Sequence, residues 1–235
     1  MVSRKKYVVA GVAAGCIAAA LVLNWIYQVV RKPTEIFFPM SGALYKTPGE
    51  TWRQYEAIFR EHSTAVMTPE LLAALAQIEG SGNPLARTPW RWRAAQDPRE
   101  VYRPASSAVG MYQITDGTFQ EAKRYCIRDH AVSEDCWFNS LYLRVIPSHS
   151  VELTSAYLDR SVARVLERRR IAASVDQKQD LAALIHLCGA TAGDSYAGRG
   201  FRLSPSQRCG EHDARAYLAR VGTMKRVFAR LSTFR

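Results

Sequence analysis

The most informative stretch of this chain covers residues 68–84 and reads TPELLAALAQIEGSGNP. Thr68 is a good N-cap residue and Pro69 suits the first helical position, so a helix is predicted to begin there. Apolar side chains then recur at helical spacing, which predicts that one face of this helix lies in a core. They belong to Leu71, Leu72, Leu75 and Ile78. The glycines that follow Glu79 predict the end of the helix.

Glu79 is the residue of chemical interest in this stretch, because its position is unfavourable for an anion. The C-terminus of a helix carries partial negative charge, and apolar neighbours also disfavour an ionised carboxyl group. Both effects favour a protonated side chain near neutral pH, which is what a general acid requires. The alternative is a solvated glutamate in the last turn, without a chemical role.

Further blocks follow downstream: SSAVGMYQI at 106–114, LAALIHLCG at 181–189 and DARAYLARV at 213–221. Together with residues 79–84, they resemble the catalytic domain of the soluble-lytic-transglycosylase family, relatives of goose-type lysozyme. The resemblance covers about residues 68–231. The positions that match the family's motifs are Glu79, Ser81, Asn83, Pro84, Ala108, Gly110, Met111, Gln113, Gly189, Tyr217 and Val221. The implied fold is mainly α, a lysozyme-like lytic transglycosylase domain, and the scarcity of strand-like alternation agrees with it.

The resemblance also implies roles for individual residues, with Glu79 as the catalytic one. The implied substrate-binding residues are Ser81, Asn83, Met111, Gln113, His186 and Tyr217. Gln113 has a structural alternative as a buried amide that holds its loop, and Tyr217 has one as part of the core. His186 stands where relatives carry a tyrosine. It is interpreted either as a partner of Glu79 or of the substrate, or as a core histidine.

The activity implied by the resemblance is the cleavage of peptidoglycan glycan strands. One glutamate, here Glu79, protonates the β-1,4 bond between N-acetylmuramic acid and N-acetylglucosamine and then takes a proton back, so the product carries a 1,6-anhydro ring. The alternatives are a lysozyme-type hydrolase on the same fold, and a weakly active or non-catalytic peptidoglycan-binding scaffold of an envelope-spanning machine. No cofactor is expected, and the scattered histidines predict no metal site.

The N-terminus predicts a membrane segment, because residues 7–30 carry no charge and basic residues flank them on both sides. As a helix, this run would reach about 36 Å, enough to cross a bilayer. We interpret residues 1–32 as a transmembrane signal anchor, with a cleaved signal peptide or a lipoprotein modified at Cys16 as alternatives. A connector at 33–46 and the lytic transglycosylase domain at 47–235 follow.

The net charge of +11 favours anionic partners such as a membrane surface or a cell-wall polymer. The simpler interpretation, which we prefer, is that this charge keeps the protein soluble and close to an acidic envelope. No helix-turn-helix, zinc-finger or RNA-binding motif supports nucleic acid as a partner. Together with the resemblance, the anchor predicts a single-pass protein of the bacterial inner membrane with its domain in the periplasm. Outside the cytoplasm, Cys126–Cys136 and Cys188–Cys209 are the expected disulfides, each closing a local loop, with free buried thiols as the alternative.

Residues 85–105 form an insertion, since relatives join the Asn-Pro pair to the next block by a shorter loop. Long loops in compact domains are usually functional or disordered. Trp90 and Trp92 offer flat rings on which sugars could stack. The alternative is that both tryptophans pack the insertion onto the domain.

The remaining elements follow from local signals. Capping boxes at Thr47 with Glu50 and at Ser174 with Gln177 predict two helix starts. A helix is predicted from Asp116 to about Arg128, and another from about 150 to 170. Residues 190–210, rich in glycine, serine and arginine, are predicted to be a loop.

Overall fold

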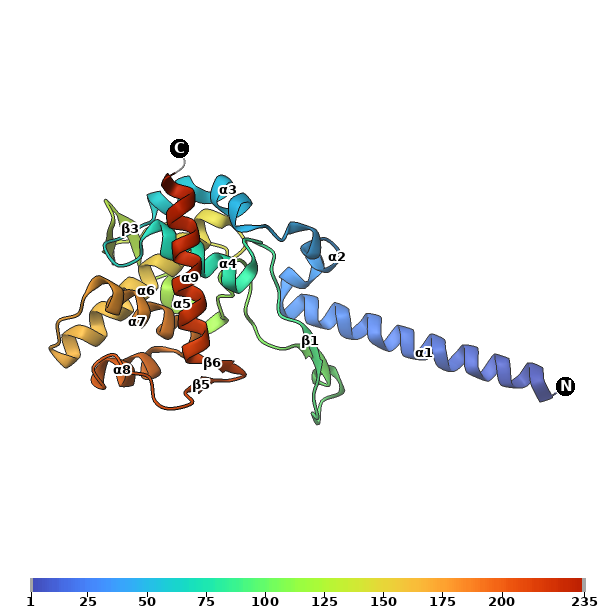
Figure 1. The fold of residues 1–235 in the computed structure, drawn as a ribbon. Helices are drawn as coiled ribbons and strands as arrows, with labels where there is room; N and C mark the ends of the chain where they lie inside the picture. The colour runs from blue at the N-terminus through green and yellow to red at the C-terminus, as the bar shows by residue number, and fades with distance from the viewer. Residues whose placement is uncertain (1, 234–235) are drawn as a thin grey trace.

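The computed structural model describes residues 2–233, and most of them lie in helices (Figure 1). The helices are α1 (Val2–Arg31), α2 (Phe38–Ser41), α3 (Pro48–Glu61), α4 (Pro69–Gly80), α5 (Asp116–Ala122), α6 (Pro147–Arg169), α7 (Val175–Cys188), α8 (Ala190–Gly198) and α9 (Ala214–Thr233). The short 3-10 helices are Pro33–Phe37, Gly42–Leu44, Pro98–Glu100 and Asn139–Leu141. The mainly α fold predicted from the sequence is confirmed.

The strands form small antiparallel hairpins rather than one sheet. They are β1 (Trp90–Trp92) with β2 (Tyr102–Pro104), β3 (Cys126–Arg128) with β4 (Ala131–Ser133), and β5 (Arg208–Cys209) with β6 (His212–Asp213). Trp90 pairs with Pro104 and Trp92 with Tyr102, so the insertion at 85–105 is an ordered hairpin. Each hairpin lies at the edge of the helical body.

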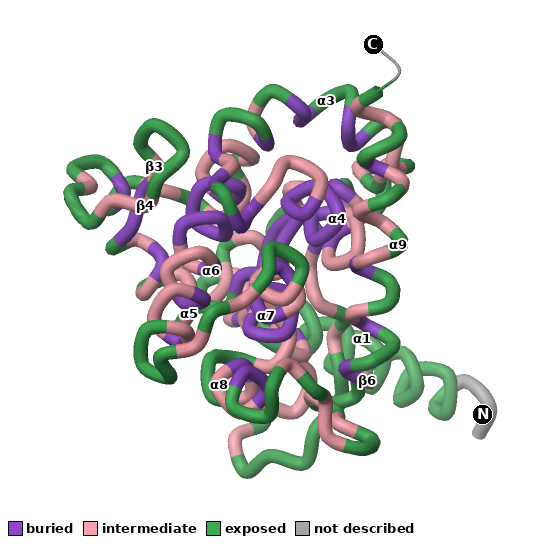
Figure 2. Tube along the Cα trace, turned by 60° about the vertical axis from the view of Figure 1, so that its left-hand side comes forward, coloured by how far each residue is buried: buried purple, intermediate pink, exposed green. Residues whose placement is uncertain are grey.

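Helix α4 is the central element of the core. The side chains of residues 71–76 are all fully buried, and Figure 2 shows α4 inside the helical body. Helices α3 and α9 pack directly on it, while α7 packs on α6, α8 and α9. A fully buried leucine contributes roughly 2 kcal/mol through the hydrophobic effect, so the apolar face of α4 is a main source of stability.

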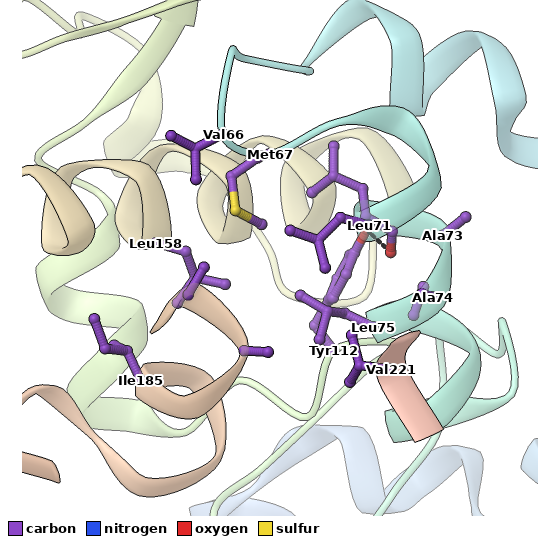
Figure 3. Close-up of a cluster of buried hydrophobic side chains, with 14 of the residues drawn as sticks. Val66, Met67, Leu71, Ala73, Ala74, Leu75, Tyr112, Leu158, Ile185 and Val221 are labelled. Carbon is purple, nitrogen blue, oxygen red and sulfur yellow. Dashed lines mark hydrogen bonds between the residues drawn. The ribbon is translucent and has the colours of Figure 1, made fainter. Parts of the chain in front are cut away.

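The packing around α4 also provides a hydrogen-bond partner for the buried hydroxyl of Tyr112. Figure 3 shows Leu71 and Leu75 beside the ring of Tyr112, with Leu158 and Val221 in the same cluster. The hydroxyl of Tyr112 donates a hydrogen bond to the carbonyl oxygen of Leu72 at 3.1 Å. This phenol is therefore buried with its donor paired, as a core tyrosine requires.

Both ends of α4 agree with the sequence prediction. The Thr68 hydroxyl accepts a hydrogen bond from the N–H of Leu71, and Pro69 is the first helical residue. At the other end Gly80 is the last helical residue and Ser81 adopts a left-handed conformation with φ of 49°. The N–H groups of Ser81 and Gly82 both reach the carbonyl oxygen of Ala76, which pairs an otherwise free acceptor of the last turn.

The predicted capping boxes are confirmed as well. In α3 the Thr47 side chain accepts from the backbone of Glu50, whose carboxylate accepts from the N–H of Thr47 at 2.8 Å. Ser174 and Gln177 make the same reciprocal pair at the start of α7, which ends at Cys188 before Gly189.

Two predicted boundaries were wrong. The helix expected from Asp116 to about Arg128 ends at Ala122, because the chain there turns into β3, which pairs with β4. The loop expected at 190–210 begins with α8. In α8, Gly193 lacks the Cβ that would lie 2.4 Å from the side chain of Ile185, so this glycine allows the helix to pack closely on α7.

Both expected disulfides are present. Cys126 is bonded to Cys136, and Cys188 is bonded to Cys209, while Cys16 is free and exposed on α1. By loop-closure entropy each bond contributes roughly 3 kcal/mol to stability. The first fixes the β3–β4 hairpin, and the second ties the end of α7 to the β5–β6 hairpin.

Helix α1 extends away from the helical body, with the N-terminus at its far end (Figure 1). Within the described residues, Lys5–Arg31 is the stretch that is long and apolar enough to cross a membrane, with a mean hydropathy of 2.1. The connector at 33–46 is not extended, since it forms short helical turns that lead into α3.

Candidate active site

Glu79 lies in the last turn of α4, and close backbone packing fixes its surroundings. A Cβ atom on Gly80 would lie 2.7 Å from the Cα atom of Met111, so this glycine lets the 110–114 segment touch the helix end. The Glu79 side chain is 19% exposed. It is thus largely enclosed but still within reach of solvent.

The hydroxyl of Tyr217, in α9, donates a hydrogen bond to Oε1 of Glu79 at 2.6 Å. Burial raises the pKa of Tyr217 well above its usual value, and the nearby carboxylate and this hydrogen bond raise it further. The phenol therefore stays protonated at any physiological pH and acts as a permanent donor to Glu79.

His186 approaches the same oxygen from α7, with Nε2 3.9 Å from Oε1 of Glu79. That distance is too long for a hydrogen bond but short enough for electrostatic contact. In the described part of the chain, Oε2 of Glu79 has no hydrogen-bond partner. The carboxyl group is thus held through one oxygen, and the other oxygen is available to a ligand as a proton donor or acceptor.

The segment after Gly110 is a tight turn, with residues 110–113 between short bridges at Val109 and Ile114. Gln113 has a φ of 48°, and its Nε2 donates to the carbonyl oxygens of Gly110 at 2.9 Å and Ala86 at 3.1 Å. These bonds correspond to the alternative interpretation of Gln113 as an amide that holds its loop. Met111 as a whole residue is fully buried, so neither its side chain nor its backbone offers a surface to a ligand in this structure.

Asn83 and Ser81 complete the turn after α4. Asn83 is fully buried, with Nδ2 2.6 Å from the carbonyl oxygen of Ser41 and Oδ1 2.8 Å from the N–H of Leu85. Direct substrate binding by its side chain is therefore wrong for this structure, because both polar atoms are occupied and no surface is open. Ser81 is half-buried, and its left-handed backbone shapes the turn.

The tryptophans of the insertion differ from each other. Nε1 of Trp90 donates to Oε2 of Glu35 at 2.8 Å, and its ring lies 5.2 Å from that of Tyr102. Trp90 therefore packs the insertion onto the connector. Trp92 stacks on Tyr102 at 4.5 Å, yet it is 70% exposed and keeps a free surface.

Sequence reasoning missed Arg144, which holds the loop facing Glu79. Its Nη1 donates to the carbonyl oxygens of Ser107 at 3.0 Å and Ile114 at 2.8 Å, and its Nη2 pairs with Asp116 at 2.7 Å. The carbonyl oxygen of Arg144 also occupies the place where Gly110 would carry a Cβ atom. A lone arginine in an irregular segment gave no sequence signal for this role.

Sequence reasoning also missed Glu35, which ties the insertion to the connector. The carboxylate is fully buried and pairs with Lys32 at 3.2 Å and Arg87 at 3.3 Å. Lys32 is a near neighbour in sequence, but Arg87 and Trp90 are 52 and 55 positions away, so no spacing pattern predicted the cluster. Among residues 2–233, no group of three or more His, Cys, Asp or Glu side chains is arranged to hold a metal ion.

Comparison with protein families gives a match to the family described as the transglycosylase SLT domain, over residues 56–175. The matched range contains Glu79, Gln113 and Arg144 but ends at the start of α7, before His186 and Tyr217. Comparison with curated proteins finds no match. The match thus covers the helix that carries the candidate acid and the loop against it.

Proposed function

Since the chain belongs to the transglycosylase SLT domain family, we propose that it is a membrane-anchored lytic transglycosylase that cleaves peptidoglycan. The bond is the β-1,4 linkage between N-acetylmuramic acid and N-acetylglucosamine, and the product ends in a 1,6-anhydro ring. One observation carries this proposal. A mostly enclosed carboxyl group, Glu79, receives the Tyr217 hydroxyl at 2.6 Å on one oxygen and keeps the other oxygen open.

In the first step, Glu79 is a general acid. Its proton goes to the glycosidic oxygen, and the bond from C1 of the muramoyl sugar to that oxygen breaks with its electron pair left on the oxygen. N-acetylglucosamine thereby leaves with a free 4-hydroxyl. The acetamido oxygen of the muramoyl sugar bonds to C1 and compensates the positive charge that develops there, so a second protein carboxylate is not needed, unlike in most glycosidases.

In the second step, the same carboxylate is a general base. The 6-hydroxyl oxygen of the muramoyl sugar attacks C1 and displaces the acetamido oxygen, and its proton passes to Glu79. The carboxyl group is protonated again, no water is consumed, and the 1,6-anhydro ring is closed. One group serves as acid and then base, which requires surroundings that tolerate both protonation states.

The neighbours of Glu79 suit this double role because neither is a permanent cation. The Tyr217 phenol can donate to the ionised carboxylate and also to the carbonyl-type oxygen of the protonated group. His186, at 3.9 Å, is proposed to adjust the local charge or to contact the sugar. The loop that Gln113 holds packs against the α4 terminus, where the backbone of Met111 touches Gly80.

The division of the chain and its location are part of the proposal. Residues 1–32 are proposed as a signal anchor, 33–46 as a connector and 47–235 as the enzymatic domain, with the domain in the periplasm and the anchor in the inner membrane. The apolar stretch of α1 supports the anchor. The Cys126–Cys136 and Cys188–Cys209 bonds support an oxidising compartment.

Digestion of purified sacculi tests the proposed chemistry. The wild-type chain should release muropeptides whose mass includes the anhydro ring, and Glu79→Gln should release none above background. Glu70→Gln is the matched control, because it changes a glutamate in the first turn of the same helix. Products heavier by one water would identify a lysozyme-type hydrolase, and binding to sacculi without any product would identify a scaffold.

A further inference from the structure

A cavity of about 270 Å³ lies at the foot of α1, by which we mean residues 24–32, where the helix meets the domain. Its wall is formed by this foot, by the chain that leaves β2 and by the start of α5. The polar side chains in the wall include Arg31, Lys32, Thr34, Arg103, Ser106 and Arg144. None of these groups takes part in the proposed chemistry at Glu79.

The wall of this cavity is strongly cationic. Arg31, Lys32, Arg103 and Arg144 line it together with a single acidic residue, Asp116. Glu35 and Glu100 pair with several of these cations, but neither belongs to the wall. Asp116 pairs with Arg144, so each of the four cations has a carboxylate partner. Because Glu100 is shared by Arg31 and Arg103, four positive charges face three negative ones, and one positive charge remains for an anion.

The basic groups also disfavour one another. Burial lowers the pKa of the Lys32 ammonium, the nearby Glu35 opposes this effect, and the positive charge of Arg144 lowers the pKa further. An anion in the cavity would relieve this repulsion. Charged groups of one sign that are brought together in partial burial are typical of a site that takes a counter-charge.

Two polar atoms of the cavity-lining residues are buried without a hydrogen-bond partner. They are Nε of Arg103 and the hydroxyl oxygen of Thr34. Buried donors are nearly always paired in native proteins, and each unpaired group costs about 1–3 kcal/mol. Nη1 of Arg103 pairs with Glu100 at 2.7 Å, but its Nε–H and the Thr34 hydroxyl lack an acceptor. These two donors match the needs of an oxyanion, since phosphate oxygens accept from both.

The position of the cavity indicates where such an oxyanion comes from. The β1–β2 hairpin packs across the foot of α1 (Figure 1), with Nδ2 of Asn24 2.7 Å from the carbonyl oxygen of Tyr102 and Nε2 of Gln28 2.8 Å from that of Arg99. These polar contacts favour a position of the foot at the boundary of the hydrocarbon layer. The exposed apolar surface of α1 runs up to the foot and continues on one side of it with Trp25, Ile26 and Val30. The cavity thus lies where headgroups meet water.

Aromatic side chains gather at the same level. Trp25 and Tyr27 lie on the foot of α1, and the hairpin adds the exposed ring of Trp92. The guanidinium of Arg99 stands 4.9 Å from the ring of Tyr27, which connects the hairpin to this group. Tryptophan and tyrosine are enriched at membrane–water interfaces, so their position agrees with a boundary at the foot.

We propose that the cavity at the foot of α1 binds the phosphate group of an anionic phospholipid from the leaflet next to the domain. The proposal rests on the membrane anchoring proposed above. Nε of Arg103 and the hydroxyl of Thr34 supply hydrogen-bond donors without an acceptor. The four basic side chains of the wall supply a positive electrostatic potential. Basic pockets beside membrane helices commonly hold lipid headgroups. The bound lipid would link α1, the insertion hairpin and the loop that Arg144 holds beside Glu79.

Native mass spectrometry of the full chain in neutral detergent tests this proposal. Both lipids, phosphatidylglycerol and phosphatidylcholine, carry the phosphate, but the choline ammonium of phosphatidylcholine is repelled by the cations of the wall, so phosphatidylglycerol should bind about tenfold more tightly. The double variant Thr34→Ala with Arg103→Gln should lose this preference. Arg230→Gln, an exposed arginine in the last turn of α9, is the matched control and should keep it.

Several outcomes would overturn the proposal. These are equal retention of both lipids by the wild type, an unchanged preference in the double variant, or release of the full chain from membranes by alkaline carbonate. Inorganic phosphate that competes as well as the lipid would identify a free ion as the ligand instead. Sacculus digestion should be unchanged in the folded double variant, so failure of the lipid site and failure of the proposed chemistry are read in separate assays.

Discussion

Two carboxyl groups of this protein are enclosed in opposite ways. Glu35, at the junction of anchor and domain, is fully buried between Lys32 and Arg87 and also receives the indole N–H of Trp90. Glu79, at the end of α4, faces the neutral phenol of Tyr217 and a histidine, and one of its oxygens is open. Opposite charges favour the ionised form of a carboxyl group, whereas neutral donors permit a change of protonation state. We therefore expect the charge of the neighbours, more than the depth of burial, to distinguish a structural carboxylate such as Glu35 from one that can exchange a proton, as proposed for Glu79.

The largest expected effect is on activity and belongs to Glu79. The substitution Glu79→Gln keeps the shape of the side chain and an acceptor for Tyr217 but removes the exchangeable proton. Muropeptide release should fall by about 10²–10⁴-fold, with the midpoint of thermal unfolding unchanged. A large loss of thermal stability in this variant would show that Glu79 is structural, and the contrast with Glu35 would disappear.

The reverse result is expected for Glu35. Glu35→Gln leaves Lys32 and Arg87 without their shared counter-charge, so the free energy of unfolding should fall by about 3 kcal/mol. Denaturant unfolding of the full chain in detergent measures this change. Sacculus digestion well below the unfolding midpoint should stay close to wild type. Glu61→Gln, on the exposed end of α3, is a control that should change neither quantity.

A smaller effect is expected from the partner of the catalytic candidate. Tyr217→Phe keeps the buried ring but removes the hydroxyl at 2.6 Å from Glu79. The rate of digestion should fall roughly tenfold and the free energy of unfolding by about 2 kcal/mol, as for the loss of one hydrogen bond to a charged group. Tyr55→Phe, at another buried tyrosine, should leave the rate unchanged. Equal rates for both variants would remove Tyr217 from the proposed site.

A third enclosed carboxylate sharpens the comparison. Glu152 is buried, and its oxygens accept from the Tyr142 hydroxyl at 2.6 Å and the N–H of Ile127 at 2.9 Å. Its partners are neutral, as for Glu79, but both oxygens are occupied. Glu152→Gln should therefore lower stability by about 1–2 kcal/mol without a direct effect on digestion. If Glu152→Gln lost activity without a loss of stability, an unoccupied carboxylate oxygen would not be the feature that distinguishes Glu79 from Glu152.

The smallest effect concerns the pH dependence of stability at the same cluster. Burial lowers the pKa of His62, although the nearby Glu152 opposes this, and burial also lowers the pKa of His149. The unfolded chain, with histidines near about 6.5, then binds protons more readily than the folded one. The free energy of unfolding should be highest above about pH 6.5 and should decline as the pH falls below that value. His62→Gln should make this decline shallower in urea unfolding curves, and an unchanged slope would contradict the assignment.

The parts of the molecule that follow helical periodicity were predictable. The caps of α4 and α7 and the buried face from Leu71 onward were read from local residue types, because capping and amphipathicity act over a few positions. The proximity of Tyr217 to Glu79 was expected only through the family resemblance. Sequence alone could not supply it, since 138 positions separate the two residues.

The parts built from polar contacts between distant segments were not predictable. The insertion hairpin is held by Asn24, Gln28 and Glu35, whose partners are backbone carbonyls and side chains far along the chain. Asn83 matched a motif, yet its burial against Ser41 depends on how the connector folds back. Such contacts leave no period in the sequence, because each depends on three-dimensional packing rather than on local spacing.

The bare backbone of Gly80 against Met111 has a mechanical consequence. With no side chain between them, the helix that carries Glu79 and the loop that carries Gln113 share one contact surface. A displacement of either is passed to the other directly, so the carboxyl group and the loop facing it keep their spacing before any ligand arrives. Preorganisation of this kind lowers the reorganisation that a reaction must otherwise include in its barrier.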